Sequence, residues 1–236
     1  MAGTTEEAPE RVLAVYAHPD DPQVSCGGTL ACWSRAGAEV HVAICASGDK
    51  GTVDPTTDPA ELVKRRVGEM DAAAAVLGLA GHHRLDHADG ELAEAADLRP
   101  QLVGLVRSLR PDTVVCPDPT AVFFGQRYFN HRDHRAVGWA ALDAVAPAAW
   151  SPLYFPEAGP PHRVAAVYLS GTLQPDTWVD ISATIDVKVE ALLCHTSQVD
   201  GPAESVRTVV RQRAEEGGRP ASLRYGEAFR VLRFVE

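Results

Sequence analysis

Two short polar segments, about 110 positions apart, carry the residue types of a hydrolytic metal site. The first reads A-H-P-D-D over residues 17–21, and the second reads N-H-R-D-H-R over residues 130–135. A hydrolytic zinc centre commonly uses two imidazoles and one carboxylate and leaves one coordination position open. His18 and Asp21 are three positions apart, as are the two histidines of the second segment, so in a helical turn each pair shares a face. Each segment therefore offers candidate ligands for one divalent ion.

The adjacent carboxylates Asp20 and Asp21 cannot easily serve one ion together, because neighbouring side chains diverge. If Asp21 is the ligand, Asp20 is left beside the activated water as a candidate general base. In the second segment, one histidine can bind the metal while the other meets charge that develops on the substrate. Asp133 is well placed to orient or tune a histidine.

Each segment alone also has an ordinary structural interpretation. Asp20 or Asp21 can cap the helix that follows, and Asp133 can interact with the dipole of a helix start. Gly27-Gly28 is not a G-x-G-x-x-G motif and gives little support to a dinucleotide site. The two segments together, each following a strand of one predicted sheet, favour the metal site.

The segments that must position these residues alternate between strands and helices. Short apolar, β-branched runs predict buried strands, and apolar residues three and four positions apart predict helices. The expected strands are residues 11–17, 39–46, 83–87, 112–119 and 163–171, and the expected helices are residues 26–37, 59–78, 98–109 and 131–145. This alternation predicts an α/β, Rossmann-like fold with a mainly parallel sheet and helices on both faces.

The binding crevice of such a sheet lies beyond the carboxyl ends of its strands. The polar segments that follow strands 11–17, 39–46 and 112–119 should therefore meet at one edge of the sheet. This expectation brings the two histidine-containing segments together in space.

The C-terminal third is expected to complete the same domain. We expect a strand over residues 176–182 and a helix over residues 185–199. Residues 200–221 are expected to form a polar segment outside the core, an excursion from which residues 222–235 return to the core. No linker separates two packed halves. We therefore expect a single domain over residues 11–236, preceded by a disordered N-terminal tail over residues 1–10.

Composition narrows the classes of function. The chain has 32 acidic and 22 basic residues and a formal charge of −10, which disfavours binding to nucleic acid or anionic membranes. No apolar run reaches the ~18 residues of a membrane span, and the N-terminus lacks the apolar segment of a signal peptide. The five cysteines form no C-x-x-C pair, as expected for reduced structural thiols. These features predict a cytoplasmic protein.

The sequence resembles the PIG-L/LmbE-like family of zinc-dependent N-deacetylases. The resemblance rests on A-H-P-D-D followed by G-G and on N-H-x-D-H-R-A-V-G. Weaker matches follow in the same order as in the family: R-x-x-E-x-x-x-A-x-x-x-L-G from Arg66, D-G-x-L from Asp89, a late K…H-x-S-Q helix from Lys188 and G-E-A-F from Gly226. The resemblance covers most of the chain and implies a deacetylase domain over residues 11–236.

The resemblance implies a metal centre and a base at matching positions. It makes His18, Asp21 and His134 the ligands of Zn²⁺, although two histidines and one carboxylate also suit Fe²⁺. It makes Asp20 the general base. It leaves open whether His195, in the late helix, lies near the active site.

Four further positions gain roles from the resemblance. His131 is expected to stabilise the oxyanion or protonate the leaving amine, and Asp133 is expected to support His131. Arg66 and Asp89 align with family positions that touch the substrate. The ordinary alternatives are a helix ion pair of Arg66 with Glu69 and a turn aspartate at Asp89.

The function expected from these residues is hydrolysis by metal-activated water. The substrate is an amino sugar, or a small molecule containing one, that loses an N-acyl group, with N-acetyl favoured. Two alternatives stay open: an amidase acting on a non-sugar or thiol-conjugate amide, and a non-catalytic module that binds a metal or small molecule on the same fold. The complete set of candidate residues argues against the second alternative. The resemblance also allows a homo-oligomer, because relatives often assemble.

Overall fold

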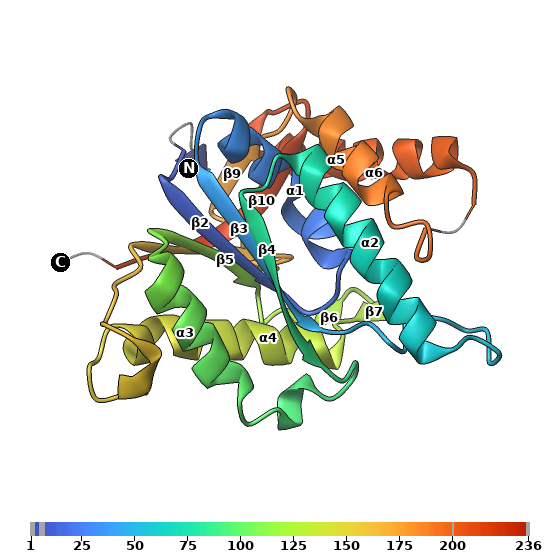
Figure 1. Ribbon diagram of the computed structural model, residues 1–236. Helices are drawn as coiled ribbons and strands as arrows, with labels where there is room; N and C mark the ends of the chain where they lie inside the picture. Colours follow the sequence, from blue (N-terminus) through green and yellow to red (C-terminus); the bar gives the residue numbers. More distant parts are fainter. Residues whose placement is uncertain (1–2, 5–7, 200, 235–236) are drawn as a thin grey trace.

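The predicted apolar runs form the strands of one sheet at the centre of the molecule (Figure 1). The computed structural model describes residues 3–4, 8–199 and 201–234. The strand order is β1-β9-β10-β8-β5-β2-β3-β4, and β10 is antiparallel to both of its neighbours while the other pairs are parallel. The bounds of the strands are Gly3–Thr4 (β1), Arg11–Tyr16 (β2), Glu39–Ala46 (β3), Gly81–His87 (β4), Thr113–Pro117 (β5), Ala166–Ser170 (β8), Thr177–Asp180 (β9) and Gly226–Arg233 (β10).

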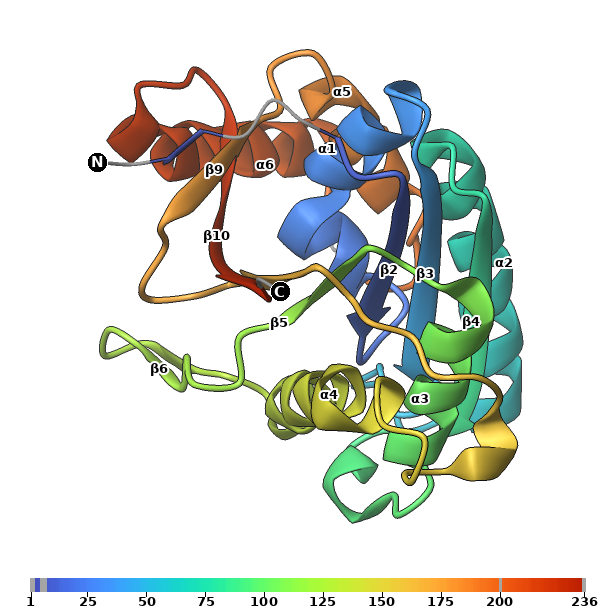
Figure 2. The ribbon, with the colours of Figure 1, turned by 90° about the vertical axis from the view of Figure 1, so that its left-hand side faces the viewer.

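Helices cover both faces of the sheet (Figure 2), which confirms the predicted α/β fold class. One face is covered by α1, α2, α5 and α6, and the other by α3 and α4. The bounds of the helices are Asp21–Arg35 (α1), Pro59–Leu77 (α2), Leu98–Leu109 (α3), Arg132–Asp143 (α4), Ile185–Leu193 (α5) and Ala203–Gly218 (α6). Shorter elements are the helical segments Leu92–Glu94 (η1), Ala144–Ala149 (η2), Pro156–Ala158 (η3) and Arg219–Ala221 (η4), and a hairpin of Phe123–Phe124 (β6) with Tyr128–Phe129 (β7). Within the described ranges, no helix is both long and apolar enough to cross a membrane.

The strand β2 contributes to the core on both faces of the sheet. Val12 and Ala14 pack against the side covered by α1, whereas Leu13 and Val15 pack against the side covered by α3 and α4. None of these four side chains is more than 1% exposed. Burial on both faces explains why this strand is a continuous apolar run instead of an alternating one.

The order of the strands creates a crevice at the end of β2. The chain builds β2, β3 and β4 outward in one direction and then returns to place β5 on the other side of β2. At such a reversal the connections leave the two neighbouring strands toward opposite faces, and a crevice opens at their carboxyl ends. The turn before α1 and the loop before α4 both meet this crevice, as the sequence predicts.

Three expectations about peripheral segments need correction. Residues 200–221 contain α6 instead of an excursion, because Val210 and Ala214 recur at helical spacing among charged residues and pack into the core. The late helix, expected over residues 185–199, ends at Leu193. The N-terminal tail is not wholly disordered, since Gly3–Thr4 extends the sheet edge beside β9, whereas residues 1–2 and 5–7 lie outside the described residues.

Candidate metal centre and active site

The turn between β2 and α1 places the first motif at the crevice. Asp21 begins α1, and its Oδ2 accepts a hydrogen bond from the backbone N–H of His18 at 2.8 Å. Asp20 precedes the helix, but its side chain makes no capping hydrogen bond. Helix capping therefore does not account for Asp20.

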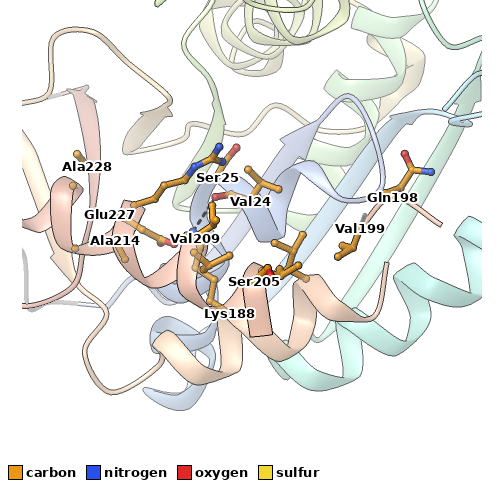
Figure 3. Close-up of a pocket in the computed structure, with 16 residues that line it drawn as sticks. Val24, Ser25, Lys188, Gln198, Val199, Ser205, Val209, Ala214, Glu227 and Ala228 are labelled. Atoms are coloured by element: carbon orange, nitrogen blue, oxygen red, sulfur yellow. Dashed lines mark hydrogen bonds and ion pairs between the residues drawn. The ribbon is translucent and has the colours of Figure 1, made fainter. Parts of the chain in front are cut away.

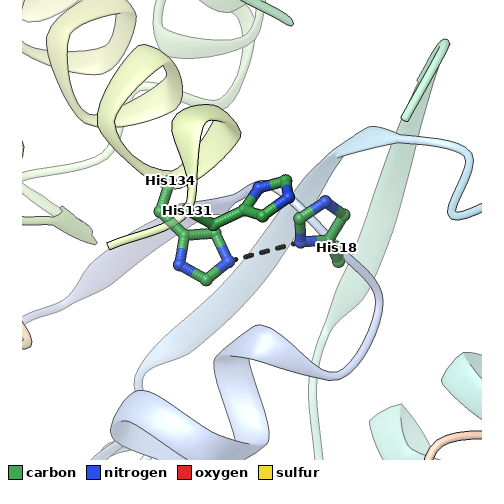
Figure 4. Close-up of side chains that lie close together, drawn as sticks. All are labelled: His18, His131 and His134. Carbon is green, nitrogen blue, oxygen red and sulfur yellow. Dashed lines mark hydrogen bonds between the residues drawn. The ribbon is translucent and has the colours of Figure 1, made fainter. Parts of the chain in front are cut away.

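The structure brings His18, Asp21 and His134 together. His134 Nε2 lies 3.1 Å from Asp21 Oδ1 and 3.3 Å from His18 Nδ1, and His18 Nδ1 lies 3.4 Å from Asp21 Oδ2. His131, immediately before α4, joins the two other imidazoles in Figure 4, with its ring centroid 5.0 Å from that of His18. Two imidazoles and one carboxylate at these separations fit a divalent ion such as Zn²⁺ or Fe²⁺.

His18 and His134 each have a second ring nitrogen, which points away from the three candidate ligand atoms and lies next to a hydrogen-bond acceptor. His18 Nε2 lies 3.1 Å from Asp89 Oδ1 and 3.5 Å from Asp133 Oδ2, and His134 Nδ1 lies 3.1 Å from Asn130 Oδ1. Such acceptors keep the proton on the outer nitrogen and leave the inner nitrogen free to act as a ligand. Asn130 was not assigned a role from the sequence, although its position four residues before His134 is a usable signal.

Asp133 contacts His18 and a neighbouring loop through its carboxylate, and His131 through its backbone. Its buried carboxylate accepts hydrogen bonds from the backbone N–H groups of Gly90 at 2.6 Å and Leu92 at 3.2 Å, and it faces His18. Its backbone N–H, not its carboxylate, contacts His131, donating to Nδ1 at 3.2 Å. The reason is that the His131 ring acts as the N-cap of α4, while the Asp133 side chain satisfies two N–H groups of the D-G-x-L loop.

Carboxylates concentrate negative charge around His18. Burial lowers the pKa of His18, but hydrogen bonds to Asp133, Asp21 and Asp89 outweigh it and raise this pKa to about 12. Burial alone would raise the pKa of Asp21, and the neighbouring His134 and His18 instead hold it well below its usual range. A half-buried cluster with this excess of carboxylates favours a bound cation.

Arg66, on α2, holds the side chain of Asp20. Its Nη2 donates to Asp20 Oδ1 at 2.7 Å and its Nη1 donates to the carbonyl of Gly48 at 3.1 Å, and the residue is only 2% exposed. The alternative pair with Glu69 does not form, because Glu69 instead accepts a hydrogen bond from Arg65. The contact that the structure assigns to Arg66 is therefore with the predicted base.

An interruption in α1 joins the first motif to two distant charged residues. The backbone of Cys26 leaves the helical region, with φ −145° and ψ 20°. Glu227 accepts hydrogen bonds at 3.1 and 2.7 Å from two backbone N–H groups after this kink, and Lys188, paired with Glu227, donates to the carbonyl of Val24 at 2.9 Å. These bonds satisfy backbone groups that an unbroken helix would have paired internally. Both residues lie in motifs of the predicted family, but the sequence alone assigned them no role.

His195 is fully buried near the end of α5. Its Nδ1 has no hydrogen-bond partner among the described residues, and burial lowers its pKa. Among the residues that the structure describes, no hydrogen bond connects His195 to His18, Asp21 or His134. The residues after it connect α5 to α2, because Ser197 donates to Glu69 through both its backbone N–H and its hydroxyl.

The fold and the site together define a class of protein. Two imidazoles and a carboxylate converge at the switch point of an α/β sheet, beside a second carboxylate that an arginine holds. These donors, at this position in the fold, are of the types that hydrolytic metal centres use.

The chain belongs to the PIG-L family, described as GlcNAc-PI de-N-acetylase, whose profile matches residues 13–145. It is 32% identical over 227 residues to the diacetylchitobiose deacetylase of Thermococcus kodakarensis, covering 94% of this chain and 83% of that protein. It is 31% identical over 247 residues to the 1D-myo-inositol 2-acetamido-2-deoxy-alpha-D-glucopyranoside deacetylase of Rhodococcus jostii, covering 80% of this chain and 82% of that protein. The chain is also similar in structure to N,N'-diacetylchitobiose deacetylase from Pyrococcus horikoshii, complexed with its inhibitor MPG, with a TM-score of 0.86. The two chains are 29% identical, and the match covers 95% of this chain and 84% of that one. The family predicted from the two motifs is confirmed.

Proposed function

We propose that this protein is a zinc-dependent N-deacetylase that removes an acetyl group from an amino sugar or from a small molecule containing one. The named relatives support the reaction class, since they are deacetylases of diacetylchitobiose and of an acetamido-glucopyranoside. The observation that carries the proposal is the arginine-held carboxylate of Asp20, next in sequence to Asp21 in the cluster with His18 and His134.

His18 Nδ1, the Asp21 carboxylate and His134 Nε2 are the groups that would hold the ion. A bound divalent cation supplies a Lewis acid, which polarises an amide carbonyl and lowers the pKa of water. We propose Zn²⁺, because its tetrahedral site with three nitrogen and oxygen ligands leaves one position open. Fe²⁺ accepts the same donors, so metal analysis of the protein must decide between the two ions.

Asp20 is proposed as the general base. Arg66 occupies Asp20 Oδ1, whereas Oδ2 has no hydrogen-bond partner among the residues that the structure describes. Oδ2 is therefore the atom that takes a proton as the water oxygen bonds to the amide carbon. When the carbon–nitrogen bond breaks, the same proton passes to the leaving nitrogen, and the acyl group departs with the water oxygen.

His131 is proposed to stabilise the oxyanion. Its Nδ1 accepts the backbone N–H of Asp133, so this atom carries no proton. Neutral His131 must then carry its proton on Nε2, where it can donate to the developing negative charge. Burial and the neighbouring His18 and His134 lower the pKa of His131, which favours this neutral form.

Asp89 is proposed to contact the substrate through its second oxygen. Its Oδ1 is taken by His18, while Oδ2 has no partner in the described part of the chain. Its backbone is fixed on both sides, because its N–H donates to Asp49 at 3.1 Å and its carbonyl accepts from Lys50 at 2.7 Å. A carboxylate oxygen held in this way can accept a hydrogen bond from a sugar hydroxyl.

The test combines metal analysis with acetate release from a panel of N-acetylated amino sugars, their glycosides, and non-sugar and thiol-conjugate amides. We expect about one ion per chain, and release from amino-sugar substrates that stops when the ion is removed. Hydrolysis confined to the other amides would support the amidase alternative, and bound metal without any hydrolysis would support the binding module. The cytoplasmic location and a homo-oligomer stay predictions, which cell fractionation and sedimentation can test.

A further inference from the structure

Two pairs of ionisable side chains away from the proposed active site differ in whether their polar atoms are satisfied. Lys188 and Glu227 line a pocket between α1, α5, α6 and β10 (Figure 3), and they bond to one another and to the backbone of α1. The second pair consists of two imidazoles, His41 on β3 and His83 on β4. The charges of the first pair are compensated, whereas the two imidazoles face one another through nitrogen atoms that can bind a further group.

The pairing of β3 with β4 places the two rings on the same face of the sheet. The strands are parallel, and His41 lies opposite Gly81, two positions before His83. Because side chains alternate between faces along a strand, those of His41 and His83 point to the same side. His82 points to the other side, where its Nε2 lies 2.7 Å from Asp71 Oδ1 on α2.

The distance between the two rings suits ligands of one metal ion. His41 Nδ1 lies 3.4 Å from His83 Nε2, and the ring planes are tilted by 36°. This separation exceeds about 2.7–3.2 Å, the usual range of N–H···O hydrogen bonds. Two nitrogen ligands of a tetrahedral zinc ion lie about 3.3 Å apart when each Zn–N bond is about 2.0–2.1 Å long. The two nitrogens are therefore spaced as they would be around one ion.

Glu39 leaves the facing nitrogen of His41 without a proton. Its Oε1 lies 3.1 Å from His41 Nε2, and its Oε2 accepts a hydrogen bond from Arg11 Nε at 2.9 Å. The carboxylate keeps the proton of the neutral ring on Nε2, so the lone pair of Nδ1 points to His83. A carboxylate behind a ligand histidine is a common feature of zinc sites, where it fixes the ring and makes it a stronger ligand.

The pair of rings is also neutral and open to an ion. Burial and the neighbouring His41 and His82 lower the pKa of His83, which favours the uncharged ring that a metal ligand requires. A Cβ at Gly81 would come within 3.1 Å of His41 Nδ1, so glycine keeps the space beside this nitrogen free. The side chain of His41 is 11% exposed, and His83 is half-buried. An ion can therefore reach both nitrogens from solvent.

We infer that His41 Nδ1 and His83 Nε2 bind a second divalent ion, Zn²⁺, whose remaining ligands are water. This site is separate from the proposed active site and independent of the proposed deacetylation. His41 pairs with Leu13, and β2 continues for about 10 Å from Leu13 to Tyr16 before the turn that contains His18. The two sites therefore lie toward opposite ends of β2.

The ion joins two strands at the edge of the sheet. β4 is an edge strand whose one neighbour is β3, and each strand supplies one ligand. With two protein ligands instead of three, this site binds zinc more weakly than the proposed active site. It therefore fills when zinc is added, and it does not change the ion content of about one per chain that we expect in the purified protein.

The direct test locates added zinc in the unchanged protein. Crystals grown with ZnCl₂ at pH 7 should give an anomalous-scattering peak between His41 Nδ1 and His83 Nε2. Because the ion binds the folded chain, Tm should also rise with zinc concentration in protein that already holds its active-site ion. The absence of a peak between these two nitrogens overturns the inference, whatever zinc binds elsewhere.

Two neighbouring histidines give a matched pair of variants. His83→Gln removes a ligand and should weaken calorimetric zinc binding at this site at least tenfold. His82→Gln is the control, because His82 lies on the same strand but bonds to Asp71 on the other face, and it should bind zinc as the unchanged protein does. Equal zinc affinity in His83→Gln and the unchanged protein, or an equal loss in both variants, overturns the inference.

A second pair of variants keeps both ligands and tests the site even if His83→Gln does not fold. Glu39 and Asp71 are exposed carboxylates, and each lies beside one histidine, His41 or His82. Glu39→Gln removes the charge that fixes the proton of His41 and should weaken zinc binding about tenfold. Asp71→Asn should leave zinc binding unchanged. Equal zinc affinities of Glu39→Gln and Asp71→Asn overturn the inference.

Discussion

Arg66 and Asp20, 46 positions apart, form an ion pair of 2.7 Å in which the arginine side chain is 3% exposed and the aspartate side chain is 25% exposed. The guanidinium is thus enclosed by protein, whereas part of the carboxylate remains accessible. A base needs this asymmetry, because one oxygen must be held while the other reaches the reacting proton.

Arg66→Lys should therefore lower kcat and leave KM and bound metal nearly unchanged. Lysine keeps the charge but cannot donate to both Asp20 and Gly48 in the geometry of the planar guanidinium. Loss of one charge-assisted hydrogen bond, about 1.5–3 kcal/mol, corresponds to a decrease in kcat of roughly 10- to 100-fold. Steady-state kinetics check this, with Arg65→Lys as the control. A higher KM at constant kcat would show that Arg66 binds the substrate directly.

The sequence predicted those parts of the site that local pattern determines. Strand 11–17 ends where the first motif begins, so His18 and Asp21 had to lie at the carboxyl edge of the sheet. The second motif forms the first turn of a helix, which places His131 and His134 on one side. Strand type, helix start and motif spacing were sufficient for these positions.

The remaining parts depend on packing between elements, which spacing does not encode. The contact of Arg66 with Asp20 depends on how α2 crosses the crevice, whereas the sequence led us to expect a substrate contact, with a pair with Glu69 as the alternative. Asp133 lies beside His18, but a hydrogen-bond partner of its carboxylate comes from a loop 43 positions away. The helix α6 was missed because its apolar residues are few and lie among many charges.

Breaking the ion pair of Lys188 and Glu227 should destabilise the fold. Glu227→Gln leaves the Lys188 ammonium buried without a counter-charge, which costs about 3–5 kcal/mol. Lys188→Met removes the charge and also leaves the Val24 carbonyl without its donor. The double variant should lose less than the sum of the two single variants, because no unpaired charge remains. Denaturant unfolding of the unchanged protein, the two single variants and the double variant measures this coupling. Strictly additive losses of unfolding free energy would contradict it.

Glu69 should contribute stability that disappears in acid. Burial raises its pKa, but hydrogen bonds from Ser197 and Thr196 outweigh burial and hold it below the ordinary value. A carboxyl with a lowered pKa in the folded state stabilises the fold above its unfolded pKa, roughly 4.3, and this contribution is lost as pH falls through the folded pKa. Glu69→Gln should therefore cost about 1–2 kcal/mol at pH 7 and progressively less in acid. Urea unfolding of the unchanged protein and of Glu69→Gln, at pH 7 and at a pH below the unfolded pKa, tests this. A loss of unfolding free energy that is the same at both pH values would refute the assignment.

Asp20 and Asp21 should respond differently to the same substitution. Asp21→Asn removes a charged oxygen from a group of ligand atoms that lie 3.1–3.4 Å apart, so it should weaken metal binding and lose activity for that reason. Asp20→Asn can keep the hydrogen bond from Arg66 at Oδ1, since the amide is nearly isosteric with the carboxylate. It should retain the metal but lose the base, with kcat lower by about 10²–10⁴.

Metal content and activity with added zinc separate the two roles. Both variants are purified, their bound ion is measured, and each is assayed with and without excess zinc. Added zinc should restore part of the activity of Asp21→Asn by refilling a weakened site, whereas it should restore none to Asp20→Asn, whose site is already filled. The folded state of each is verified by its unfolding transition, because Asp21 also accepts the backbone N–H of His18. If Asp20→Asn loses the ion while Asp21→Asn keeps it, the ligand and the base are exchanged, and the proton path through Asp20 Oδ2 is wrong.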